Sequence, residues 1–203
     1  MLRLNYTASP AGAPDTYGAT KDVLRAQDGT LLQDFPKSAT GLAPVSPALA
    51  AAVDGWIARR SVTSAPVIVM VHGYLYNPDR PADAAASPFG SVYGLPGTAL
   101  AYNLSWLPIV GECDQAGANL SDCAIAFSYT SSASASEFSA AGWNNQYQYA
   151  ALDLSPLAAR ALATVLSHLM DRGIPIRILA HSLGTRTVSQ AMRVLAPRLP
   201  GTI

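Results

Sequence analysis

The sequence carries little charge, and what it has is balanced. Charged residues make up 13% of its 203 residues, and the formal net charge is zero. A neutral chain gives no electrostatic reason to expect nucleic acid or an anionic membrane surface as a partner. Uninterrupted apolar runs all fall short of the roughly 20 residues that a transmembrane helix needs, so we expect no membrane span.

Cysteine and targeting signals are also scarce. The first seven residues lack the apolar core of a signal peptide, so the expected location is cytoplasmic. The two cysteines, Cys113 and Cys123, lie in a loop-like region, and two thiols are favoured over a disulfide. The cysteines and histidines nowhere show metal-ligand spacing, so we expect no metal site.

Half of the residues are hydrophobic, which is typical of a sheet buried under helices. We treat residues 1–203 as a single domain. Helices are predicted over residues 47–60 and 156–172, each opened by a Ser-Pro pair in which the serine caps the helix. Gly173 closes the second helix. His168 falls on the polar side of that helix and is expected to be exposed.

Apolar runs predict buried strands over residues 67–71 and 123–129, and residues 174–180 are predicted to form a further strand. The first residues alternate and predict a short strand over 2–6, Asp28-Gly29 marks a hairpin turn, and residues 98–106 suit a helix. Alternating strands and helices favour an α/β fold with a mostly parallel central sheet and helices on both faces. A ligand would then bind beyond the carboxyl ends of the strands.

Two short motifs lie at those strand ends. The last predicted strand runs into Ala180-His181-Ser182-Leu183-Gly184, the small-x-Ser-x-Gly pattern of a nucleophile elbow. Small residues two before and two after the serine let a strand and a helix meet in a tight turn. The strand over 67–71 runs into His72-Gly73-Tyr74, where the glycine can turn the Tyr74 N–H toward the same edge.

Together these motifs resemble the α/β-hydrolase superfamily, and within it a poorly characterised bacterial group of esterase-like serine hydrolases. The resemblance covers about residues 66–197. It implies hydrolysis of carboxylic esters or related small acyl substrates without a cofactor. By that resemblance Ser182 is the nucleophile, and the backbone amides of Leu183 and Tyr74 form the oxyanion hole.

The sequence departs from that family after the serine. In this fold the triad acid and base follow the nucleophile, yet no His, Asp or Glu occurs after Ser182. His72 and His168 precede the serine, and His181 adjoins it with a side chain expected to point away. We therefore expect a hydrolase truncated at its C-terminus, with its later strands missing, little or no activity, and an exposed last strand that makes it poorly stable.

Two other functions remain open on the sequence alone. The missing triad partners fit a non-catalytic binding protein on the same scaffold, and an acyltransferase shares the elbow geometry. The segments over 75–97 and 130–153 are expected to shape the pocket, with Trp143, Tyr147 and Tyr149 as candidate walls. Nothing in the sequence predicts the oligomeric state.

Overall fold

A computed structural model describes residues 1–8, 22–36, 41–60, 63–76, 93, 106, 123–132, 139, 142 and 144–199. Six strands form one sheet in the order β3-β2-β1-β5-β4-β6. The strands are β1 (Leu2–Thr7), β2 (Asp22–Ala26), β3 (Leu31–Phe35), β4 (Val67–Val71), β5 (Ala124–Tyr129) and β6 (Ile176–Ala180). Each of them agrees with a predicted strand or with the hairpin at Asp28-Gly29 to within a few residues.

The central strands are parallel, as predicted. β5 pairs in parallel with β1 and with β4, and β4 pairs in parallel with β6. The hairpin of β2 and β3 adds two antiparallel pairings at the β1 side. The molecule is therefore an α/β protein with a mixed, mostly parallel sheet, whose parallel strands end at one common edge.

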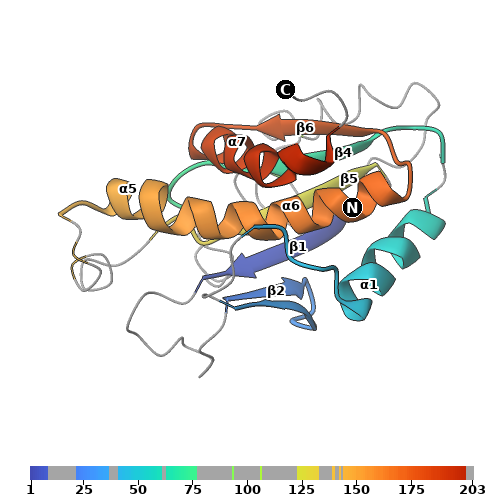
Figure 1. Cartoon of the computed structure of the whole chain (residues 1–203), viewed down its shortest axis with the longest axis horizontal. Helices are drawn as coiled ribbons and strands as arrows, with labels where there is room; N and C mark the ends of the chain where they lie inside the picture. The colour runs from blue at the N-terminus through green and yellow to red at the C-terminus, as the bar shows by residue number, and fades with distance from the viewer. Residues whose placement is uncertain are drawn as a thin grey trace.

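The helices of the described residues cover one face of this sheet. They are α1 (Pro47–Ala58), α5 (Gln146–Tyr149), α6 (Ser155–Asp171) and α7 (Leu183–Leu195), with a π-helical turn η3 (Ala150–Leu154) and a 3₁₀ turn η4 (Ala196–Arg198). Figure 1 shows α6 and α7 lying across the strands. Buried residues of α1, α6 and α7 join one core with Val67, Val69 and Val71 of β4.

The opposite face of the sheet is covered differently. Ile68 and Met70 point there, because side chains alternate along a strand, and they pack with Tyr93 and the partly buried Tyr76 and Trp106. The described helices contribute no residue to this second cluster. The prediction of helices on both faces is thus met on one face within the described part of the chain.

One helix differs from its prediction at its start. α5, η3 and α6 run on as a single helix from Gln146, capped by the Asn145 side chain, which accepts from the Gln148 N–H at 3.0 Å. Pro156 has no N–H to donate, and the N–H of the preceding residue, Ser155, donates five residues back to the Ala150 carbonyl. The prediction that Ser155 caps a helix beginning at Pro156 was therefore wrong.

Ser155 has a packing role instead. Its hydroxyl is buried and lies 2.8 Å from the Thr187 hydroxyl of α7. This contact ties the middle of the long helix to the first turns of α7, because both groups satisfy each other away from water.

The same long helix bears on the expectation that the chain has no membrane span. Within the described residues, Gln146–Asp171 is long and apolar enough to cross a membrane, and 78% of its apolar window is buried inside the domain. A core helix meets the same criteria, so it is weak evidence for a span.

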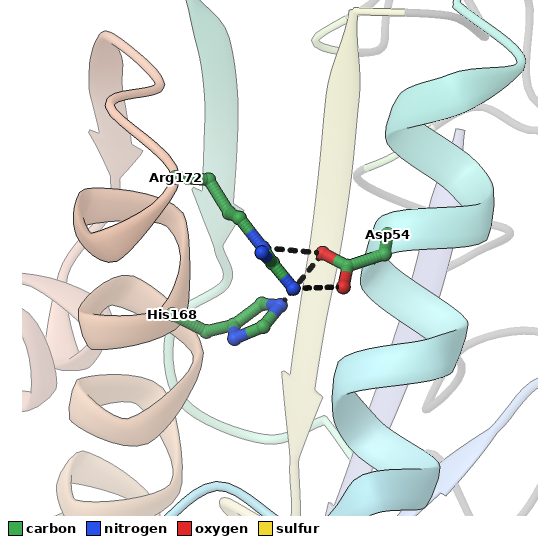
Figure 2. A network of polar contacts seen from close by, with 3 residues as sticks. All are labelled: Asp54, His168 and Arg172. Carbon is green, nitrogen blue, oxygen red and sulfur yellow. Dashed lines mark hydrogen bonds and ion pairs between the residues drawn. The ribbon is translucent and has the colours of Figure 1, made fainter.

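The expectation that His168 is exposed was also wrong. Its side chain is buried, and its Nε2 atom lies 2.8 Å from the Asp54 carboxylate of α1. Arg172 donates to both oxygens of that carboxylate, as Figure 2 shows. Desolvation opposes ionisation of Asp54, but the hydrogen bonds from Arg172 and His168 outweigh it and lower the pKa of the carboxyl group. These three side chains join α1 to the C-terminal end of α6.

Some predictions concern residues outside the described part of the chain. The helix over 98–106 is one of them apart from Trp106, and Cys113 and Trp143 are others. Most of the two segments expected to shape a pocket also falls there. Cys123 is described and is buried at the start of β5.

Candidate functional site

Ser182 occupies the turn between β6 and α7. Its backbone has φ 52° and ψ −122°, a left-handed conformation that residues with a side chain rarely adopt. A non-glycine residue held there costs about 1–3 kcal/mol, and such residues cluster at functional sites. The serine is exposed at the carboxyl end of β6, so the elbow predicted at this position agrees with the local backbone.

Gly184 explains how so tight a turn is formed. A Cβ atom there would lie 2.4 Å from the His72 carbonyl oxygen and 2.5 Å from that of Val71. The first turn of α7 therefore rests directly on the backbone at the end of β4. The turn is closed by the Gly184 N–H, which donates to the His181 carbonyl at 2.9 Å. Leu183 is the first residue of α7, where a helix N–H has no partner within the helix.

The second motif lies beside the first. A Cβ atom on Gly73 would be 3.1 Å from the Ser182 Cβ and 3.1 Å from the His181 Nδ1. The chain that leaves β4 thus passes against the serine, and Tyr74 follows immediately. The structure brings Ser182, Leu183 and Tyr74 to one edge of the sheet, as the two motifs predicted.

His72 is a buried structural residue. Its Nε2 atom accepts a hydrogen bond from the Tyr129 N–H at 3.0 Å, which leaves Nδ1 to donate to the Gly73 carbonyl at 2.9 Å. Its ring also stacks on that of Tyr129, with centroids 4.6 Å apart. Burial, the largest influence, lowers the pKa of His72 to about 4, so the imidazole is neutral near pH 7 and holds β4, β5 and the loop together.

The structure describes all three histidines of the chain, and their positions bear on which of them could act as a base for Ser182. Both ring nitrogens of His72 are engaged. His168 lies near the C-terminal end of α6, thirteen residues along the helix from Ser155, which contacts Thr187 near the start of α7. His181 adjoins Ser182 and is exposed. Among the described residues, no side chain forms a hydrogen bond with the Ser182 hydroxyl.

Aromatic residues lie near the serine. Tyr74 and Tyr147 meet edge to face, with ring centroids 5.2 Å apart. Burial and then the nearby Tyr147 raise the pKa of Tyr74, so the Tyr74 phenol is neutral at physiological pH. Of the three aromatics proposed to wall a cleft, Tyr147 remains a candidate, Tyr149 is buried in the core, and Trp143 lies outside the described residues.

Two open grooves of the described structure lie away from the serine. One of about 600 Å³ is lined by residues 33, 34, 36, 42–47 and Arg160, and another of about 470 Å³ by residues 42–45, 167, 168, 171 and Arg198. Ser182 lines neither of them.

Two residues near the serine had no signal in the sequence. Ser131, just beyond β5, is buried and bonds to several backbone groups of the loop after β4. The Tyr93 hydroxyl accepts from the His72 N–H at 3.0 Å. It can donate to the carbonyl of Met70 in β4 or to that of Phe127 in β5. Neither residue belongs to a motif, since their roles arise only when distant strands align.

The strain at Ser182 leads to a stability prediction. Glycine adopts this backbone conformation without cost, so Ser182→Gly should raise the free energy of unfolding by about 1 kcal/mol. Ser182→Ala keeps the strain and should change stability little. Urea unfolding followed by circular dichroism measures both variants. A Ser182→Gly variant less stable than Ser182→Ala contradicts the prediction.

The chain was compared with family models, curated proteins and solved structures. No family model, no curated protein and no solved structure matches the chain.

Proposed function

We propose that this protein is a serine hydrolase of the α/β-hydrolase type that acts on carboxylic esters or related acyl substrates. One observation carries the proposal: Ser182 is an exposed serine in a strained left-handed turn between a parallel strand and a helix. Natural sequences favour glycine in such a backbone, so a serine there calls for a reason other than stability.

The chemistry follows from what surrounds the serine. In the proposed reaction the Ser182 oxygen attacks the acyl carbon, its proton leaves to a base, and the carbonyl oxygen becomes negative. The amides of Leu183 and Tyr74 then donate to that oxygen. Each such donor contributes roughly 3–4 kcal/mol to the transition state. The helix dipole of α7, whose positive end lies at Leu183, adds to the same stabilisation.

The base is the open part of the proposal. His72 has both nitrogens bonded, and His168 lies beside Asp54 at the other end of α6. Without an aligned base a serine hydroxyl is a weak nucleophile near neutral pH. We therefore expect slow acylation and little turnover from the 203-residue chain.

The test is active-site labelling. Over a long incubation a fluorophosphonate probe should modify Ser182 slowly in the folded chain, because the oxyanion donors act without an aligned base. Ser182→Ala should abolish the labelling while the circular dichroism spectrum stays the same. Peptide mapping by mass spectrometry locates the adduct. Ser189, an exposed serine further along α7, provides the matched Ser189→Ala control, which should label normally. Labelling that is absent, or that persists in Ser182→Ala, counts against the proposal.

A second function is favoured by the positions of the histidines. With no described side chain bonded to the Ser182 hydroxyl, the same scaffold also suits a non-catalytic protein that binds an acyl or other small ligand. That function predicts no labelling of Ser182, so the probe experiment separates the two.

A further inference from the structure

We propose that Ser131 is the positioning residue that sets the loop over residues 73–76, and with it the amide of Tyr74. The inference rests on the proposed function, in which that amide binds the oxyanion. Ser131 lies two residues beyond the end of β5 and is fully buried. It reaches the loop from a strand more than 50 residues further along the chain.

The hydrogen bonds from Ser131 enclose Tyr74 on both sides. The Ser131 hydroxyl donates to the Gly73 carbonyl at 2.8 Å and accepts from the Tyr76 N–H at 3.1 Å. The Ser131 N–H donates to the Tyr76 carbonyl at 2.8 Å. The Ser131 carbonyl accepts from the Leu75 N–H, with oxygen and nitrogen 3.4 Å apart. Gly73, Leu75 and Tyr76 are thus all tied to one residue.

Tyr74 is left out of this set. None of the hydrogen bonds between Ser131 and the loop uses the Tyr74 N–H. A template that binds the residues before and after one amide fixes its direction while leaving the amide available. Such preorganisation is what an oxyanion donor needs, since it avoids rearrangement during the reaction.

The backbone of the loop shows that it is held rather than relaxed. Leu75 has φ 76°, a left-handed value that is unfavourable by about 1–2 kcal/mol for a bulky residue. Its side chain is 53% exposed, so packing of the leucine does not repay that cost. His72 Nδ1 bonds the loop at the Gly73 carbonyl, whereas Ser131 bonds it on both sides of Tyr74 and at Leu75 itself, so we assign the shape of the loop around Leu75 to Ser131.

The experiment separates positioning from folding by comparing two reactions at one atom. In a Ser182→Cys background the introduced thiol is nucleophilic without a triad base. With iodoacetamide the sulfur bonds to the methylene carbon and iodide leaves, and no oxyanion forms. With p-nitrophenyl acetate the sulfur attacks the carbonyl carbon, an oxyanion forms, and p-nitrophenolate leaves to give a thioester. Mass spectrometry of the peptide that contains residue 182 excludes signals from Cys113 and Cys123.

We expect Ser131→Ala to lower the ratio of acylation to alkylation at least about tenfold, because an ångström of misplacement costs on the order of 10²-fold. Ser131→Thr retains the hydroxyl and should restore most of the ratio. Ser167→Ala is the matched control, since Ser167 is another buried serine that bonds an arginine at the far end of α6. A ratio unchanged in Ser131→Ala overturns the inference.

Two additions keep the test decisive. If Ser131→Ala does not fold, Leu75→Pro removes the N–H that bonds the Ser131 carbonyl and excludes the φ of 76°, so it should lower the ratio in the same direction. Amide hydrogen exchange by NMR gives a readout that does not depend on chemistry. Exchange at Tyr76 should rise at least about tenfold in Ser131→Ala and not in Ser167→Ala. If the parent thiol shows no acylation advantage over a small free thiol, the proposed function fails, and exchange alone then decides the role of Ser131.

Discussion

Replacing Gly184 with alanine should destabilise the protein by about 3 kcal/mol. The new methyl group would lie 2.4 Å and 2.5 Å from two backbone oxygens, those of His72 and Val71. Backbone atoms at the end of a central strand cannot rotate aside as a flexible side chain can, so α7 must move off β4. Urea denaturation followed by tryptophan fluorescence measures the loss, and Ser182 labelling should fall with it.

Gly55 provides the matched control for this experiment. It also lies in a helix, and a Cβ atom there would meet only Arg59 Nη1, at an ordinary 3.5 Å. Because alanine is the better helix former, Gly55→Ala should stabilise the protein by up to about 1 kcal/mol. If both substitutions have the same effect, the proposed close approach of α7 to β4 is not what constrains Gly184.

Acidification should weaken the fold between pH 6.5 and about pH 4 through His72. Burial lowers the pKa of this imidazole from 6.5 to about 4, so in this range the unfolded chain takes up a proton that the folded chain excludes. The free energy of unfolding therefore falls as the pH drops through this window and levels off below it. Since one pKa unit is worth about 1.4 kcal/mol, the loss approaches roughly 3 kcal/mol.

The side chains around His72 should not disturb this window. Its ring packs against the phenol rings of Tyr76, Tyr93 and Tyr129, with no carboxylate among these contacts. Stability that depends on Asp54, whose pKa is lowered, is lost only below pH 3.8. Urea midpoints measured across pH 4–7 should flatten in His72→Asn, which cannot titrate, and remain sloped in His181→Asn at an exposed position. A parent curve that is already flat contradicts the prediction.

Much of the fold could be predicted from local sequence patterns. The run that forms β4 is apolar without interruption and that of β5 nearly so, which specifies strands buried on both faces, whereas Arg177 interrupts the run of the half-buried β6. Ser46 was predicted to cap α1, and its hydroxyl accepts from the Leu49 N–H at 3.1 Å. The elbow at Ser182 was readable for the same reason, because a strand end, small residues and a helix start all adjoin in the sequence.

Features that depend on distant partners were not readable. His168 lies on the polar side of its helix, and only the approach of Asp54 from α1, 114 residues away, buries it. Ser155-Pro156 has the local pattern of a helix start, yet the packing of Ser155 on Thr187 favours a continuous helix with a π turn. Ser131 likewise acquires its role only when β5 lies next to β4. The candidate oxyanion loop was predicted, but what holds it was not.

The position of β6 at the border of the described sheet has a consequence for the serine that follows it. β6 pairs with β4 on one side only, and its residues Ile176, Ile178 and Leu179 are half-buried, whereas every residue of β4 is buried. A border strand opens by local fluctuation more readily than an interior one. Each opening would carry Ser182 away from Gly73. The strength of the pairing between β6 and β4 therefore sets the fraction of time in which the serine is aligned with the neighbouring amides.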